Sequence, residues 1–232
     1  INRQFNYKDI NGVDQNTLVQ TGNPDLKWEE AATTGAGIDL TTKDSRLNVT
    51  VDYFYTKRTN ILFNAPTPGG FAPTSNWFIN LPGYVINKGW EVSFGYKIIK
   101  GKNFSWDANY NMTFVKNELR DMPVPVITGG VSGQGLTGAY AQTFTNGQPL
   151  FTWSMPVFRG FDGNGNARYE NGAQNQLVGT AIPNFFAGLT NNFTLGNWSL
   201  SVFANAVTGF HVYNNTANAL FLKGSLRNGR NV

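Results

Sequence analysis

Residues 23–63 read NPDLKWEEAATTGAGIDLTTKDSRLNVTVDYFYTKRTNILF. On both sides of the polar stretch 42–45, small or apolar side chains alternate with polar side chains or glycine, which is the period of strands with two unlike faces. The apolar-face series are Ala32, Thr34, Ala36, Ile38 and Leu40, and then Leu47, Val49, Val51, Tyr53 and Tyr55. A short polar connection suits a tight turn. The stretch therefore predicts one long antiparallel hairpin.

The arms of this hairpin are about twice as long as the roughly five-residue strands of soluble proteins. Their length and alternation are typical of a membrane-spanning β-barrel, which needs about ten tilted residues per pass, apolar toward lipid and polar toward the lumen. Only 14% of the 232 residues are charged, against a usual share of about a quarter, and 14% are aromatic. No run of about 18 apolar residues marks a transmembrane helix. We therefore predict an all-β protein built as an antiparallel transmembrane β-barrel.

Two further hairpins show the same alternation. One has arms at 90–98 and 104–114 around a turn at 100–103, and the other has arms at 185–195 and 198–206 joined by Gly196 and Asn197. These turns are short, whereas the connections 64–84, 118–149 and 160–181 are long. Outer-membrane barrels have short periplasmic turns and long extracellular loops, so the lengths predict which end of the sheet faces outward.

Weaker patterns cover the rest of the chain. Residues 1–22, 64–84 and 160–181 are interpreted as loops, with weak strands near 140–144 and 151–158, the latter limited by Pro156 to an edge, an end or a bulge. The count is seven or eight strands, and no patterned strand follows the last hairpin, which predicts an incomplete section of a larger barrel. Because the sequence begins at Ile1, we expect a removed targeting segment or a start inside a longer protein.

Composition also narrows the chemistry. The absence of cysteine excludes disulfides and thiolate metal sites, and the scattered basic residues that give the net charge of +4 argue against nucleic acid as a partner. We predict no cofactor, no metal site and no catalytic site. Lone His211 lacks partners for a triad. Asp162, Asn164 and Asn166 imitate the start of a calcium loop in residues 162–173, but Ala167 and Ala173 stand where such a loop needs Gly and Glu, which favours plain turns.

Taken in order, several segments resemble the SusC/RagA-type TonB-dependent transporters of the outer membrane. They are 23–29 (NPDLKWE), 46–55 (RLNVTVDYFY), 85–91 (VINKGWE), 147–149 (GQP), 182–189 (IPNFFAGL) and 209–214 (GFHVYN). The resemblance implies a barrel of about 22 strands, an N-terminal plug on which TonB acts, and a SusD-like surface lipoprotein as partner. Residues 1–232 would then be the C-terminal section of the barrel with its extracellular loops, and the plug would be absent from them.

The expected function is that of an outer-membrane importer of oligosaccharides or peptides in a Gram-negative bacterium, to which this chain supplies wall and loops. It is not expected to be an enzyme. Two alternatives stay open: a soluble carbohydrate-binding β-sandwich and a small self-contained outer-membrane barrel. The sandwich requires that the apolar faces of 47–55 and 104–114 pack against a second sheet.

Three groups of candidate site residues follow. Trp77 and Phe78, expected in an exposed loop, are candidates for stacking on substrate. Polar residues expected to line the lumen are Asp107, Asn109 and Asn111. Aromatic residues expected to anchor the barrel in the lipid at headgroup level are Tyr53, Tyr55, Trp90, Trp106 and Trp198.

Overall fold

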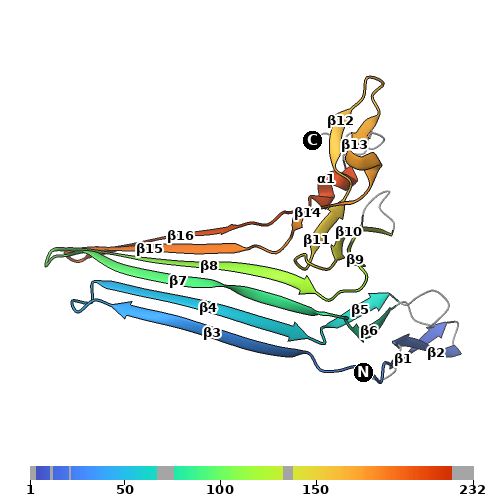
Figure 1. The fold of residues 1–232 in the computed structure, drawn as a ribbon, viewed down its shortest axis with the longest axis horizontal. Helices are drawn as coiled ribbons and strands as arrows, with labels where there is room; N and C mark the ends of the chain where they lie inside the picture. The colour runs from blue at the N-terminus through green and yellow to red at the C-terminus, as the bar shows by residue number, and fades with distance from the viewer. Residues whose placement is uncertain (1–3, 11–12, 21, 67–75, 133–137, 221–232) are drawn as a thin grey trace.

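Six long strands form one antiparallel sheet in the computed structural model, which describes residues 4–10, 13–20, 22–66, 76–132 and 138–220. The order across the sheet is β16-β15-β8-β7-β4-β3, so each strand pairs with the next long strand along the chain (Figure 1). Their bounds are β3 Glu30–Thr41, β4 Leu47–Thr59, β7 Tyr84–Lys100, β8 Phe104–Arg120, β15 Phe185–Leu195 and β16 Trp198–Thr208. The three predicted hairpins are confirmed, although β7 and β8 extend several residues beyond the predicted arms.

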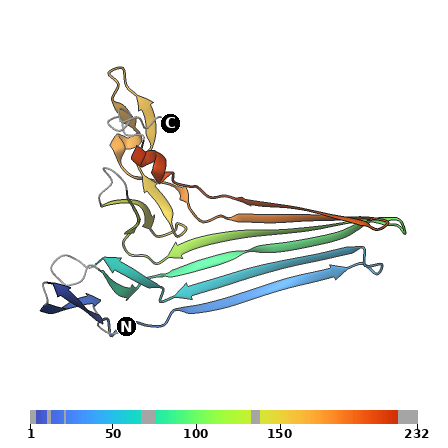
Figure 2. The ribbon, with the colours of Figure 1, turned by 180° about the vertical axis from the view of Figure 1, so that it is seen from behind.

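The two ends of the sheet differ. The three short turns lie together at one end, which we call the turn end, and every other element gathers at the opposite end, which we call the connection end (Figures 1 and 2). The outer edges of β3 and β16 pair with no other strand in the described part of the chain. An unpaired backbone edge cannot persist in a bilayer, so the sheet is an incomplete section of a larger barrel, as predicted.

Segments expected as loops contain strands. The hairpin of β1 Gln4–Ile10 with β2 Val13–Gln20 corrects the interpretation of residues 1–22, and the hairpin of β5 Leu62–Pro66 with β6 Asn76–Asn80 corrects that of residues 64–84. The proline-rich composition suggested that no ladder could run there. It can, because Pro66 stands at the end of a two-stranded ladder, where its missing N–H removes no interior hydrogen bond.

The connection between β8 and β15 is also structured. It forms a four-stranded sheet in the order β14-β11-β10-β9 and a separate β12–β13 hairpin. Their bounds are β9 Val126–Val131, β10 Ala139–Phe144, β11 Thr152–Met155, β12 Phe158–Phe161, β13 Ala167–Tyr169, the 3-10 turn Glu170–Ala173 and β14 Gln176–Thr180. The weak strand near 140–144 is confirmed, and β11 ends directly before Pro156, as the proline predicted. The loop predicted at 160–181 and the total of seven or eight strands are wrong, since sixteen strands lie within the described residues.

Among the described residues, α-helix is confined to one short segment, α1 Asn215–Leu220. No helix within the described ranges combines the length and the apolar character needed to cross a membrane.

The two faces of the long sheet are chemically distinct, because cross-strand partners share a face and the strands align their alternating series. On one face, the apolar face, Trp90 pairs with Tyr53 and Phe114, and Phe114 pairs with Phe185. Its side chains stay exposed, Ile38 at 65%, for example. No second sheet of the described chain covers this face, which contradicts the β-sandwich alternative.

One irregularity adjusts the predicted pattern. A β-bulge between Lys97 and Ile99 leaves Ile98 without a partner in β8, while Ile99 pairs with Trp106. The predicted arm ended at Ile98, one residue before the bulge brings Ile99 onto the apolar face opposite Trp106. Because two isoleucines follow each other here, an alternating pattern cannot show which of them lies on the apolar face.

A small hydrophobic core lies at the connection end. Val85 of β7 and Leu119 of β8 are almost fully buried and contact residues of both long connections. Its buried members are Leu81, Val85, Leu119, Met122 and Phe144, with Ile61, Phe63, Val126 and Leu150 packed against them. Because it draws on β5, β9 and β10, this core fixes the connections to the wall.

Candidate functional site

The predicted lumen residues lie together on the second face of the sheet, the polar face. Asp107, Asn109 and Asn111 take alternate positions of β8, opposite in direction to Ala108 and Tyr110 between them. The Asp107 carboxylate accepts hydrogen bonds from Nδ2 of Asn192 on β15 at 2.9 Å and from Nδ2 of Asn109 at 3.3 Å. Asn109 and Asn111 are exposed. The three residues thus present fixed hydrogen-bonding groups on one side of the wall.

Polar side chains continue across the remaining strands of this face. The Thr50 hydroxyl donates to the Asp39 carboxylate at 2.6 Å, and Asp52 of β4 stands directly opposite Glu91 of β7. These carboxylates are spread along neighbouring strands, and within the described residues no three His, Cys, Asp or Glu side chains converge as a metal site would require. The arrangement offers a hydrated, hydrogen-bonding surface rather than a reaction centre.

The five predicted anchoring aromatics all lie on the apolar face, toward its two ends. Trp106 and Trp198 are near the turn end, where the rings of Trp106 and Phe193 stack at 5.6 Å. Tyr53, Tyr55 and Trp90 are toward the connection end, and the rings of Tyr53 and Trp90 are 5.0 Å apart.

Between these aromatic rows lies an apolar band whose height suits a membrane. Phe104 and Phe114 are ten residues apart on β8, about 34 Å along the strand, and a tilt of about 40° reduces this to roughly 26 Å, close to the roughly 25 Å band of outer-membrane barrels.

Trp77 and Phe78 are not loop residues. They lie in β6, where Trp77 pairs with Ala65 and Phe78 with Asn64, and both side chains are half-buried. The composition of the surrounding segment concealed this strand. Their exposure is therefore smaller than the sequence suggested, and their role in substrate contact stays a prediction.

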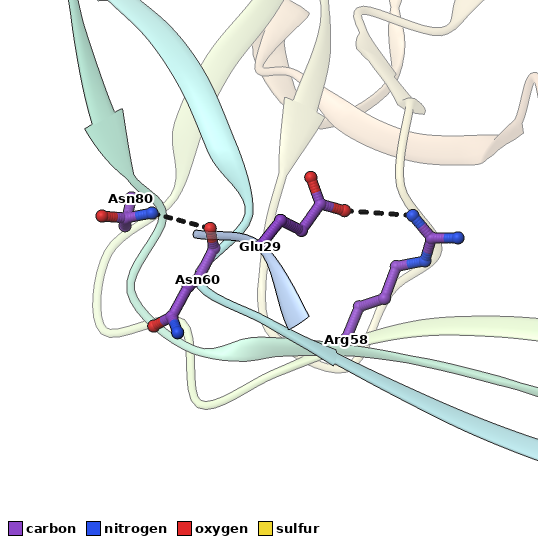
Figure 3. A network of polar contacts seen from close by, with 4 residues as sticks. All are labelled: Glu29, Arg58, Asn60 and Asn80. Atoms are coloured by element: carbon purple, nitrogen blue, oxygen red, sulfur yellow. Dashed lines mark hydrogen bonds and ion pairs between the residues drawn. The ribbon is translucent and has the colours of Figure 1, made fainter. Parts of the chain in front are cut away.

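The segment 23–29, which opens the series of motifs, is fixed to the β5–β6 hairpin by side-chain amides. Asn23 Nδ2 donates to the Phe78 carbonyl at 2.9 Å. Asn80 accepts from the Lys27 N–H at 2.8 Å and donates to the carbonyls of Lys27 at 3.0 Å and Asn60 at 2.7 Å. Figure 3 shows Asn80 beside Asn60, and Glu29 extended toward Arg58, with which it forms an ion pair at 3.0 Å. The motif thus joins the β5–β6 hairpin to the chain that enters β3, the first strand of the long sheet.

The loop that imitates a calcium site forms a turn held by its own aspartate. Asp162 accepts from the N–H groups of Asn164 at 2.9 Å and Asn166 at 2.8 Å, and from Asn166 Nδ2 at 3.1 Å. Hydrogen bonds from Asn166 to its carboxylate hold the pKa of Asp162 below its ordinary range. These contacts give the turn arrangement that the sequence favoured over a calcium loop.

Two aromatic groups at the connection end escaped the sequence analysis. Trp153 and Tyr213, with ring centroids 5.8 Å apart, line a cavity of about 210 Å³ together with His211, whose carbonyl accepts from Trp153 Nε1 at 2.9 Å. The other group is exposed on the β12–β13 hairpin, which projects farthest from the sheet (Figure 1). It consists of Phe158, Phe161 and Tyr169, whose rings lie 5.2 and 5.9 Å apart. The first group joins residues distant in sequence, so no local pattern could have identified it. The second lies within residues 158–169, most of which the sequence analysis interpreted as a loop.

Comparison with known proteins gives consistent relatives. A TonB-dependent receptor, P39, of Formosa agariphila is 40% identical over 123 residues, which is 52% of this chain and 11% of that protein. A second receptor of that organism, P3, is 25% identical over 235 residues, covering 89% of this chain and 23% of its own length. The TonB-dependent receptor SusC of Bacteroides thetaiotaomicron is 33% identical over 97 residues, which is 42% of this chain and 10% of SusC. The chain thus spans at most about a quarter of these relatives.

A solved structure shows the same fold. The RagAB peptide transporter superposes with a TM-score of 0.74 at 17% identity, covering 92% of this chain and 25% of the matching chain. The sequence family described as "TonB dependent receptor-like, beta-barrel" matches residues 2–225. Members of this family are outer-membrane transporters, not enzymes. The two-faced sheet, its open edges and this match agree, and the chain belongs to the TonB-dependent receptor β-barrel family.

Proposed function

We propose that residues 1–232 form the C-terminal section of the barrel, with external loops, of a TonB-driven importer in the outer membrane of a Gram-negative bacterium. The observation that carries this proposal is the two-faced six-stranded sheet, apolar over a membrane-sized band on one side and hydrogen-bonding on the other. The plug on which TonB acts lies outside these 232 residues in this proposal. The chain contributes wall and loops and catalyses no reaction.

The substrate class that we propose is an oligosaccharide or a peptide, captured with a SusD-like surface lipoprotein. SusC and the RagAB peptide transporter support this choice as relatives in sequence and fold. The surface supports it as well, because Asn109, Asn111 and Asp107 offer amide and carboxylate groups that hydrogen-bond hydroxyls and peptide groups alike. The half-buried Trp77 and Phe78 and the exposed aromatics of the β12–β13 hairpin offer stacking surfaces outside the wall.

The test uses substitutions that add bulk to the polar face at one place and leave the apolar face unchanged. In the full-length protein, we expect Asn109→Trp combined with Asn111→Trp to reduce energy-dependent uptake of a labelled peptide or oligosaccharide severalfold, because two indoles then project from the polar face. Uptake is measured in intact cells, and the lipoprotein is followed by its copurification with the barrel.

Tyr110 provides the matched control, because it lies between the two asparagines and points to the opposite face. Tyr110→Trp should leave uptake unchanged. Uptake that persists at full rate without TonB, or that Tyr110→Trp impairs as strongly as the asparagine variants, would contradict the proposal.

A further inference from the structure

Basic side chains continue the apolar face beyond its aromatic row at the connection end. One row further along the strands, Tyr55 pairs with Lys88 and Lys88 with Lys116. In the next row Lys57 pairs with Ile86 and Ile86 with Glu118, and in the third row Tyr84 pairs with Arg120. Successive rows on one face are about 7 Å apart. Four basic groups therefore lie on three adjacent strands just past the apolar band.

Two carboxylates share these rows: Glu118 on β8, and Glu30 on β3, which pairs with Thr59 in the third row. Glu118, whose side chain is 8% exposed, forms ion pairs with Arg120 at 2.6 Å and Lys116 at 3.2 Å. The Lys57 ammonium lies over the Tyr84 ring, 3.9 Å from its centroid. No carboxylate in the described part of the chain lies within ion-pair distance of Lys57 or Lys88. Four basic groups against two acids, Glu118 and Glu30, leave this patch a net charge of +2.

The patch borders an apolar cavity on the same face. The cavity has a volume of about 640 Å³, and four aromatic residues line it together with Lys88 and Lys116, which lie one row beyond Trp90 and Phe114. The ring-bearing residues are Tyr53, Trp90, Phe114 and Phe185. An apolar lining with two ammonium groups at one end matches a lipid, since an acyl chain can lie on the rings while an anionic headgroup meets the lysines.

We propose that Lys57, Lys88 and Lys116 bind the phosphate-bearing headgroup of one lipid of the outer leaflet, whose chain occupies the aromatic cavity. Lysine is a common phosphate ligand, and phosphate would supply the negative charge that Glu118 and Glu30 leave uncompensated. The inference rests on the proposed function, because it requires that the apolar face meet lipid and that the connection end face outward. Free phosphate shares the headgroup chemistry but would leave the cavity empty.

The experiment uses the full-length protein, stripped of lipid in detergent and offered phosphorylated lipid A, its dephosphorylated form, or inorganic phosphate. Native mass spectrometry counts the lipids retained. We expect one phosphorylated lipid on the wild-type protein and about tenfold weaker retention by Lys88→Gln combined with Lys116→Gln, because two cationic contacts are lost. Lys88→Arg with Lys116→Arg should restore retention.

Lys43 and Lys102, in two turns at the opposite end of the sheet, provide the matched control, and Lys43→Gln with Lys102→Gln should retain the lipid fully. Equal retention by K88Q/K116Q, or equal retention of dephosphorylated lipid, would overturn the inference. Displacement of the lipid by inorganic phosphate at matched concentration would assign the lysines to the free ion instead. Membrane extraction and uptake by the same variants separate the two proposals: a barrel that inserts and transports but ignores lipid phosphate refutes this inference alone.

Discussion

Gly89 shows how one residue sets the spacing of two strands. It lies in β7 within the motif at 85–91, opposite Val115 of β8, and a Cβ atom there would collide with the carbonyl oxygen of Phe114 and lie 2.9 Å from Cζ of Phe54. The Phe54 ring of β4 covers the space that a side chain would need. The glycine is thus required by the close approach of a backbone and a ring, rather than by an unusual φ angle.

We expect Gly89→Ala to destabilise the full-length protein by about 1–3 kcal/mol, the usual cost of overpacking a well-packed site. The measurement is the urea midpoint of unfolding in lipid vesicles. Gly130→Ala in β9 is the control, because its Cβ would meet Tyr140 at an ordinary 3.7 Å. Equal midpoints for the two variants would contradict the prediction, because they would show that β7 can move away from Phe54 and Phe114 without loss of stability.

The side chain of Asn80 joins segment 23–29 to the β5–β6 hairpin. Its side chain makes three of the hydrogen bonds that join segment, hairpin and the end of β4. Removing the amide in Asn80→Ala should cost about 1–3 kcal/mol, at roughly 1 kcal/mol per net hydrogen bond. Hydrogen exchange of the amides at 22–29 should accelerate, while Asn205→Ala on the exposed face of β16 should leave it unchanged. Unaltered exchange in the Asn80 variant would mean that the segment is held by other contacts.

For the single elements, the sequence predicted the bounds of long strands better than those of short strands. Eleven residues of alternation defined β15 to the residue, because every second side chain had to suit one of two solvents, and the predicted arm 198–206 ended two residues before β16 does. Strands of three to six residues, such as β9 and β13, repeat too few times to show a period, and contacts distant in sequence decide their pairing. The five-residue strand that contains Trp77 was missed for this reason, whereas the bulge at Ile98 was missed because two consecutive isoleucines hide the shift. The lysines of the connection end did carry a local signal, since Lys88 and Lys116 continue the series of Trp90 and Phe114 by one step.

The whole molecule makes sense only if its two faces meet different surroundings. Leu189 lies near the middle of the apolar band, and Thr190 follows it on the polar face. We expect Leu189→Lys to destabilise the full-length protein in lipid vesicles by about 2–4 kcal/mol, whereas Thr190→Lys should change stability far less. Urea unfolding of the two variants in the same vesicles measures the difference. A larger effect at Thr190 would reverse the assignment of the faces.

The buried cluster of Leu81, Val85, Leu119, Met122 and Phe144 limits how new specificity can arise in this protein. Val85 and Leu119 come from the long strands β7 and β8, while the other three side chains come from the connections 60–83 and 121–184, so neither connection has a hydrophobic core of its own. Exchanging only one of them with a relative would leave mismatched volumes at the shared contacts, such as the edge-to-face pair of Phe63 and Phe144 at 5.6 Å. A chimera that folds should therefore exchange residues 60–83 and 121–184 at the same time. For the same reason, we expect the two connections to be inherited together when related genes recombine.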